Sequence, residues 1–146
     1  MNRRFFIYMT AVFFVFSFLF SCHKSYNAED DARVVAEQFS DNYYSWKLKE
    51  ALRFSDKEMQ QRIRFLASNI TKADLLVLHE ATEVPKIVIE TIDIENDSMA
   101  TADVALEYVY IADSIGSVVH LEKEVHNRLL MKRCTNGWRI SDVRKD

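Results

Sequence analysis

The sequence is poor in the residues that break or cross-link a chain: two glycines, one proline and two cysteines among 146 residues. So little glycine and proline excludes a flexible linker protein. Two cysteines, with no CxxC pair and no His/Cys cluster, exclude a disulfide-rich scaffold and a structural zinc motif. Basic residues form no block and the formal net charge is −3, which argues against nucleic acid as a partner. No motif for a cofactor is present.

A long hydrophobic run occupies the amino end. Residues 5–20 are almost wholly apolar, and Arg3 and Arg4 precede them, an arrangement typical of an export signal. The stretch at 19–22, Leu-Phe-Ser-Cys, resembles the lipobox of bacterial lipoproteins. That resemblance implies cleavage before Cys22, a diacylglycerol thioether on its sulfur and acylation of its amine, usually by palmitate. The alternative is an uncleaved membrane anchor with an incidental cysteine.

Cleavage at that site would divide the chain into a signal peptide at 1–21, a lipidated tether at 22–27 and one domain at 28–146. Arg3 and Arg4 are the only charged side chains of residues 1–21, so their removal takes the formal net charge from −3 to −5. We expect a protein of the cell envelope held on a membrane by the lipid of Cys22. His23, in the place where Asp favours the inner membrane, indicates the outer membrane, on either face.

Lipidation of Cys22 would leave Cys134 without a disulfide partner. We expect Cys134 to be a small half-buried residue beside a turn, rather than a reactive thiol.

Helical periodicity covers the first half of the domain. Val35, Phe39, Tyr43 and Trp46 recur at steps of four, four and three, which predicts a helix from Ala28 with a break near residues 42–45. The pattern resumes through Leu48, Leu52 and Phe54. Ser55 and Glu58 have capping-box spacing for a helix to Ile70, and a further helix is expected from Lys72 to about Ala81.

After Pro85 the period changes from helical to alternating. Strands are predicted at about 87–94, 102–110, 119–131 and 138–143, separated by turns at 95–98, 113–116 and 136–137. In the second strand Ala102, Val104, Leu106, Tyr108 and Tyr110 should share the buried face. The order indicates an α+β fold with N-terminal helices packed on a curved four-stranded antiparallel sheet.

This order resembles the nuclear transport factor 2-like (cystatin-like cone) superfamily, and within it the small bacterial lipoproteins of unknown function. The resemblance rests on the first helix at 32–44, the following segment at 49–52 and the closing Asn-Gly-Trp-Arg-Ile at 136–140. It implies a pocket between the first helix and the sheet, which ketosteroid isomerase and polyketide cyclases use for acid–base chemistry.

Five aromatic residues are candidates to line such a pocket: Tyr43, Trp46, Tyr108, Tyr110 and Trp138. No Asp or His matches the catalytic positions of those enzymes, so no catalytic residue is assigned. We therefore expect a domain that binds a small ligand or an envelope protein without catalysis, with a lipid-anchored isomerase or cyclase as the alternative. Aromatic residues at helical spacing more often fill a core than line a site.

Two further patterns have alternative interpretations. On one face of the third strand, His120 with Glu122, or Glu124 with His126, could ligate a metal, but a solvated outer face is favoured, so no metal site is predicted. That face, around residues 120–128, could instead pair with a second copy of the chain.

Asp97-Ser98-Met99 and Asp113-Ser114-Ile115 resemble the sites of an O-glycosylation system of some Gram-negative gut bacteria. Both fall in predicted turns, where a modifying enzyme could reach Ser98 and Ser114. The alternative is that Asp-Ser is simply favourable turn chemistry.

Overall fold

The computed structural model describes residues 27–113 and 116–146. Its helices come first: α2 (Ala28–Tyr44), α3 (Leu48–Ala51), a 3-10 turn η1 (Leu52–Phe54), α4 (Lys57–Ser68) and α5 (Lys72–His79). The predicted break after the first helix is confirmed, because α2 ends at Tyr44. Among the described residues, no helix combines the length and the hydrophobicity needed to cross a bilayer.

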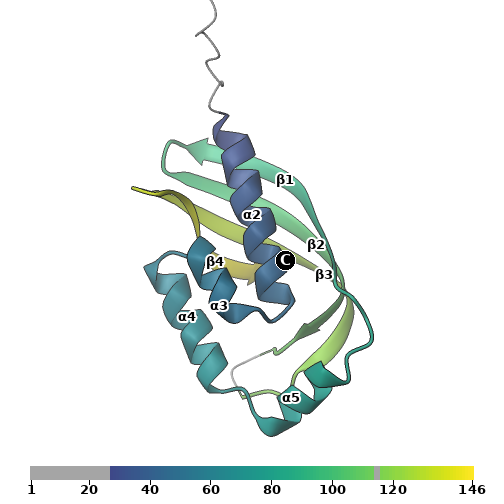
Figure 1. The fold of residues 1–146 in the computed structure, drawn as a ribbon. Helices are drawn as coiled ribbons and strands as arrows, with labels where there is room; N and C mark the ends of the chain where they lie inside the picture. The colour runs from purple at the N-terminus through teal and green to yellow at the C-terminus, as the bar shows by residue number, and fades with distance from the viewer. Residues whose placement is uncertain (1–26, 114–115) are drawn as a thin grey trace, which may run out of the picture.

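Four antiparallel strands follow in the order β1-β2-β3-β4: Lys86–Asn96, Met99–Ile111, His120–Cys134 and Gly137–Lys145. The sheet curves, and α2 lies across its concave face with α3 and α4 beside β4 (Figure 1). The α+β fold of helices on a curved four-stranded meander is therefore confirmed. Gly137, with φ of 93°, takes the left-handed conformation that the tight β3–β4 turn requires.

Each of the longer helices begins at a polar cap. The Asn27 side chain accepts from the amide of Glu29 at the start of α2, and Asp56 accepts from the amide of Met59 at 2.9 Å. The predicted capping box at Ser55 is therefore wrong: its hydroxyl instead donates to the carbonyl of Ala51 at 2.8 Å. The adjacent carboxylate of Asp56 takes the capping position.

The core lies between α2 and the concave face of the sheet. Small residues, Ala32 and Ala36, let the α2 backbone approach the strands closely, and Phe39 fills the space beyond them. The buried apolar side chains of this core cluster are Ala32, Ala36, Phe39, Tyr44, Leu48, Ala51, Met59, Ile63, Ala100, Ala102, Val104, Leu106, Val109, Val125, Leu129, Met131, Trp138 and Ile140.

The alternation of β2 changes phase at Tyr108. Ala102, Val104 and Leu106 are buried as predicted, but Tyr108 is 42% exposed and the next residue, Val109, is buried. Tyr108 has φ of 55°, a left-handed conformation that breaks the regular pleat of the strand. The prediction that Tyr108 shares the buried face is therefore wrong.

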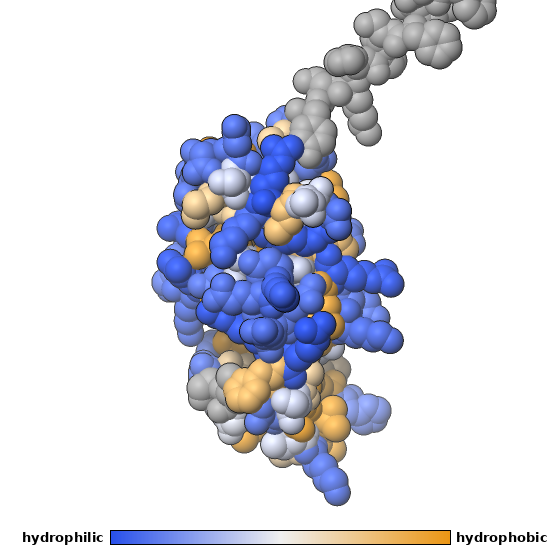
Figure 2. All heavy atoms as spheres, turned by 90° about the vertical axis from the view of Figure 1, so that its left-hand side faces the viewer, coloured by the Kyte–Doolittle hydropathy of each residue, from blue (hydrophilic) through white to orange (hydrophobic). Residues whose placement is uncertain are grey.

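A buried carboxylate fixes α5 to the residue that precedes β3. Asp74, only 4% exposed, completes a capping box with Thr71, and its Oδ1 accepts from the amide of Val119 at 2.9 Å. Most of α5 is otherwise open to solvent, with Leu75 and Leu76 exposed. Figure 2 shows hydrophobic side chains gathered in the lower part of a largely hydrophilic face.

The outer face of the sheet is charged. Arg128 of β3 pairs with Asp103 of β2 at 2.7 Å, and Lys86 of β1 pairs with Glu107. The thiol of Cys134 is exposed at the end of β3 rather than half-buried, because the turn to β4 leaves it uncovered.

Candidate functional site

A cavity of about 520 Å³ lies where the carboxyl end of α2 meets α4, the ends of β2 and β4 and the first half of β3. The residues lining it are Tyr43, Tyr44, Trp46, Arg62, Phe65, Leu66, Tyr110, Ile111, Ala112, Asp113, Val125, Asn127, Val143 and Lys145. Its walls are mainly aromatic and aliphatic, with a few polar groups. That composition and volume suit a small, largely apolar ligand.

A buried hydrogen bond crosses the cavity wall. The Asn127 amide of β3 donates to the Tyr44 hydroxyl of α2 at 2.7 Å, and both side chains are buried. In the part of the chain that the structure describes, the Tyr44 hydroxyl has no acceptor for its own proton. Burial raises the pKa of the Tyr44 phenol well above its ordinary value, although the hydrogen bond from Asn127 lowers it. Tyr44 therefore stays a neutral donor.

Aromatic contacts hold the helical wall in place. Tyr43 stacks on Phe39 with ring centroids 5.1 Å apart and meets Tyr44 edge to face at 5.2 Å. Trp46 has φ of 59°, and its indole nitrogen donates to the Tyr110 carbonyl at 2.8 Å. These contacts link the end of α2 to β2, so this wall is preformed rather than built by a ligand.

Charged side chains of both signs line the cavity. Arg62 of α4 is paired with Asp142 and Glu58. Lys145 of β4 has no carboxylate partner within residues 27–113 and 116–146. Asp113 is the sole carboxylate among the described lining residues, and its side chain is 62% exposed. Among the described residues that line the cavity, Lys145 is therefore the cation without a carboxylate partner.

The structure brings together three of the five candidate pocket residues. Tyr43, Trp46 and Tyr110 line the cavity. Tyr108 is exposed because its left-handed backbone breaks the regular pleat of β2. Trp138 is 1% exposed in the core, with Arg133 5.8 Å over its ring, and does not line the cavity.

Sequence reasoning missed Asn127, Arg62 and Lys145 at this site. Asn127 carried a usable signal, since it is a polar residue on the apolar face of the predicted third strand. A buried amide needs a partner, and this one finds it in a tyrosine 83 positions earlier. Nothing local in the sequence indicates Arg62 or Lys145.

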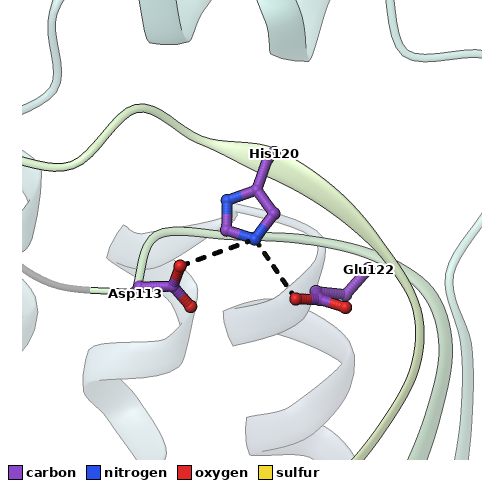
Figure 3. A group of neighbouring side chains, drawn as sticks. All are labelled: Asp113, His120 and Glu122. Carbon is purple, nitrogen blue, oxygen red and sulfur yellow. Dashed lines mark hydrogen bonds and ion pairs between the residues drawn. The ribbon is translucent and has the colours of Figure 1, made fainter.

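A second group of side chains lies at the start of β3. The Nε2 atom of His120 is 3.2 Å from Glu122 Oε1 and 3.7 Å from Asp113 Oδ2 (Figure 3). The hydrogen bond with Glu122, then that with the Val118 carbonyl, raises the pKa of His120.

The remaining candidates concern modification. Ser98 is exposed in the β1–β2 turn, where its hydroxyl donates to Asn96 Oδ1 at 2.8 Å. Ser114 and Cys22 lie outside the described residues. Glycosylation and lipidation stay predictions.

The sequence matches no protein-family model and has no significant match among curated proteins. Solved structures are similar in fold. A ketosteroid isomerase-like protein from Erwinia carotovora atroseptica superposes with a TM-score of 0.54 at 9% identity, over 82% of this chain and 97% of that one. An NTF-2 like protein of unknown function from Shewanella oneidensis gives a TM-score of 0.49 at 12% identity, over 77% of this chain and 98% of that one.

At such low identity the likeness establishes the fold alone. The described part of the chain has the nuclear transport factor 2-like fold.

Proposed function

We propose that this protein is a lipoprotein of the cell envelope whose cone-shaped domain binds a small ligand without catalysis. The observation that carries the binding role is the cavity of about 520 Å³ with a mainly apolar lining. The ligand class follows from the three kinds of group on its wall. The proposed ligand has an apolar body that contacts the aromatic and aliphatic side chains, an acceptor for the Tyr44 hydroxyl and an anionic end that pairs with Lys145.

Binding is favoured over catalysis because of where the carboxylates lie. Isomerase or cyclase chemistry needs a base held inside the cavity, with its pKa adjusted by the surroundings. Among the described lining residues, the only carboxylate is the solvent-exposed Asp113. The buried Asp74 is fixed by Thr71 and Val119 and does not line this cavity.

The binding role is tested with an amphipathic probe, 8-anilinonaphthalene-1-sulfonate, by calorimetric titration of the full chain in detergent. Leu66→Trp adds bulk to the cavity wall and should weaken binding at least about tenfold, since a filled site loses most of its apolar contact. Lys145→Gln should weaken it less.

Leu75→Trp on the exposed face of α5 is the matched control and should bind like the wild type. Equal affinity for Leu66→Trp and Leu75→Trp would mean that the probe binds elsewhere, and the proposed role would be withdrawn.

Membrane attachment through Cys22 rests on the lipobox-like stretch at 19–22, and two acyl signals make anchoring stable. Intact mass of the protein extracted from membranes tests it. We expect a chain that begins at Cys22 and carries diacylglycerol and acyl mass, and a Cys22→Ala variant that keeps residues 1–21. A wild type that keeps residues 1–21 without lipid would contradict the anchor.

The same mass spectrum tests modification at Ser98 and Ser114. Hexose-scale mass lost in the Ser98→Ala or Ser114→Ala variant would support glycosylation, and an unmodified chain would exclude it in that host.

A homodimer through the outer sheet face is a further proposal, tested by sedimentation of the wild type against Arg128→Glu.

A further inference from the structure

Three side chains at the open end of the sheet lie in the arrangement of a metal site. Asp113 follows β2, while His120 and Glu122 lie on the same face of β3, two residues apart. One ligand atom from each can be chosen so that all three lie within 4.8 Å of one another. Figure 3 shows both carboxylates directed toward the same nitrogen of His120.

The distances match those around a small cation. Ligands at about 2.0–2.1 Å from a tetrahedral zinc ion lie roughly 3.3–3.4 Å from one another. The observed separations from His120 Nε2 are 3.2 Å to Glu122 and 3.7 Å to Asp113. Rotation of the exposed Asp113 side chain would be sufficient to complete the set.

Hydrogen-bond acceptors lie at both nitrogens of the imidazole ring, and such surroundings suit a bound cation. Its Nδ1 atom is 3.4 Å from the Val118 carbonyl, and its Nε2 atom faces the two carboxylates. Every neighbour is an acceptor, so a neutral ring must direct a lone pair at one of them. A metal ion at Nε2, with the Nδ1 proton donated to Val118, removes this conflict and is the usual arrangement of a ligating histidine.

We infer that Asp113, His120 and Glu122 form a binding site for a divalent transition-metal ion of the zinc class. The two carboxylates neutralise the charge of the ion. The imidazole selects against Mg²⁺ and Ca²⁺, which prefer oxygen ligands. Three protein ligands leave at least one position for water, as in open zinc sites. This inference does not depend on the proposed ligand-binding role.

A second histidine of the same strand supplies a matched control. His126 also has two carboxylate neighbours, but Glu90 is 3.5 Å from Nδ1 and Glu124 is 3.5 Å from Nε2. The carboxylates therefore approach opposite edges of the ring, and one ion cannot reach His126 and both of them. His126→Ala changes the same residue type on the same exposed face without touching the inferred site.

The test is calorimetric titration of the full chain in detergent with ZnCl₂, in a Cys22→Ala, Cys134→Ser background that removes both thiols. We expect one zinc ion per chain with micromolar affinity, and visible absorption on titration with CoCl₂. His120→Ala and Glu122→Gln should each weaken binding at least about tenfold, and His126→Ala should not.

Because all three side chains are at least partly exposed, these variants should keep the circular dichroism spectrum of the parent. Absence of zinc binding at millimolar concentration would overturn the inference. Equal losses for His120→Ala and His126→Ala would also overturn it, since they would indicate only general attraction to an acidic surface.

Discussion

The Asn127 amide of β3 donates to the Tyr44 hydroxyl of α2 at 2.7 Å, which joins the first helix to the third strand inside the wall of the cavity. Both side chains are buried, so neither can exchange this bond freely for water. The pair therefore fixes the shape of the cavity as well as the packing of the helix.

Tyr44→Phe should destabilise the domain by about 1–3 kcal/mol, because it leaves the Asn127 amide buried without its acceptor. Tyr44→Phe combined with Asn127→Leu should recover part of that loss, since both polar partners are then absent. Urea denaturation of the two single variants and the double variant measures the coupling. Additive losses would show that the bond contributes nothing beyond packing.

Asp74→Ala should detach the region before β3 from α5. The carboxylate accepts hydrogen bonds from Thr71 and from the Val119 amide, and these bonds hold the pKa of Asp74 below its usual value. Hydrogen exchange at the Val119 amide should accelerate at least about tenfold, the equivalent of one lost hydrogen bond. The β1 amides should not change, and faster exchange there would indicate global unfolding instead.

Asp103 should contribute to acid sensitivity. The hydrogen bond from Arg128, then that from Thr91, lowers the pKa of Asp103. A carboxyl group with a depressed folded-state pKa stabilises the fold above its unfolded pKa of about 4, and this contribution disappears as pH falls through the folded value. Asp103→Asn should therefore be less stable than the wild type at pH 7, with the gap closing below about pH 4.

Urea denaturation at neutral and acid pH measures that gap, and Asp93→Asn at an exposed position of β1 is the control. A gap for Asp103→Asn that stays constant with pH would mean that packing, not charge, is responsible.

Tyr108 has a left-handed backbone that costs an ordinary residue about 1–2 kcal/mol. Because its side chain is largely exposed, Tyr108→Gly should be more stable than Tyr108→Ala by about 1 kcal/mol. At Thr101, in a regular part of the same strand, glycine should instead be less stable than alanine by about 0.5–1 kcal/mol. The same preference at both positions would argue against strain at Tyr108.

The element order could be predicted from the sequence because periodicity is a local property. The change from helical to alternating period after Pro85 and the Asn-Gly turn at 136–137 gave the four-stranded meander. The exposure of Tyr108 could not be predicted, because the alternation of apolar residues through Leu106 and Tyr108 is regular in the sequence. Only the backbone shows that the strand changes phase there. The predicted cap at Ser55 was wrong because two adjacent residues could both cap the helix. The carboxylate of Asp56 takes that position.

The candidate site was predictable only in part. Tyr43 and Trp46 belong to one helical stripe, which the spacing revealed, and Tyr110 was one of several aromatic residues on a strand. Lys145 and Arg62 reach the cavity from β4 and α4 through packing that no local pattern encodes. Asp113 joins His120 and Glu122 only because the chain returns on itself between β2 and β3.

The direction of α2 has a consequence for how a ligand would arrive. The helix starts where the preceding chain enters the domain and ends at the cavity, and its 17 residues span about 25 Å. If Cys22 carries the proposed lipid, α2 acts as a spacer between the point of attachment and the mouth of the cavity. With α2 perpendicular to that membrane, the mouth would lie clear of the bilayer, and a hydrophobic molecule would reach it through the aqueous phase or from another protein.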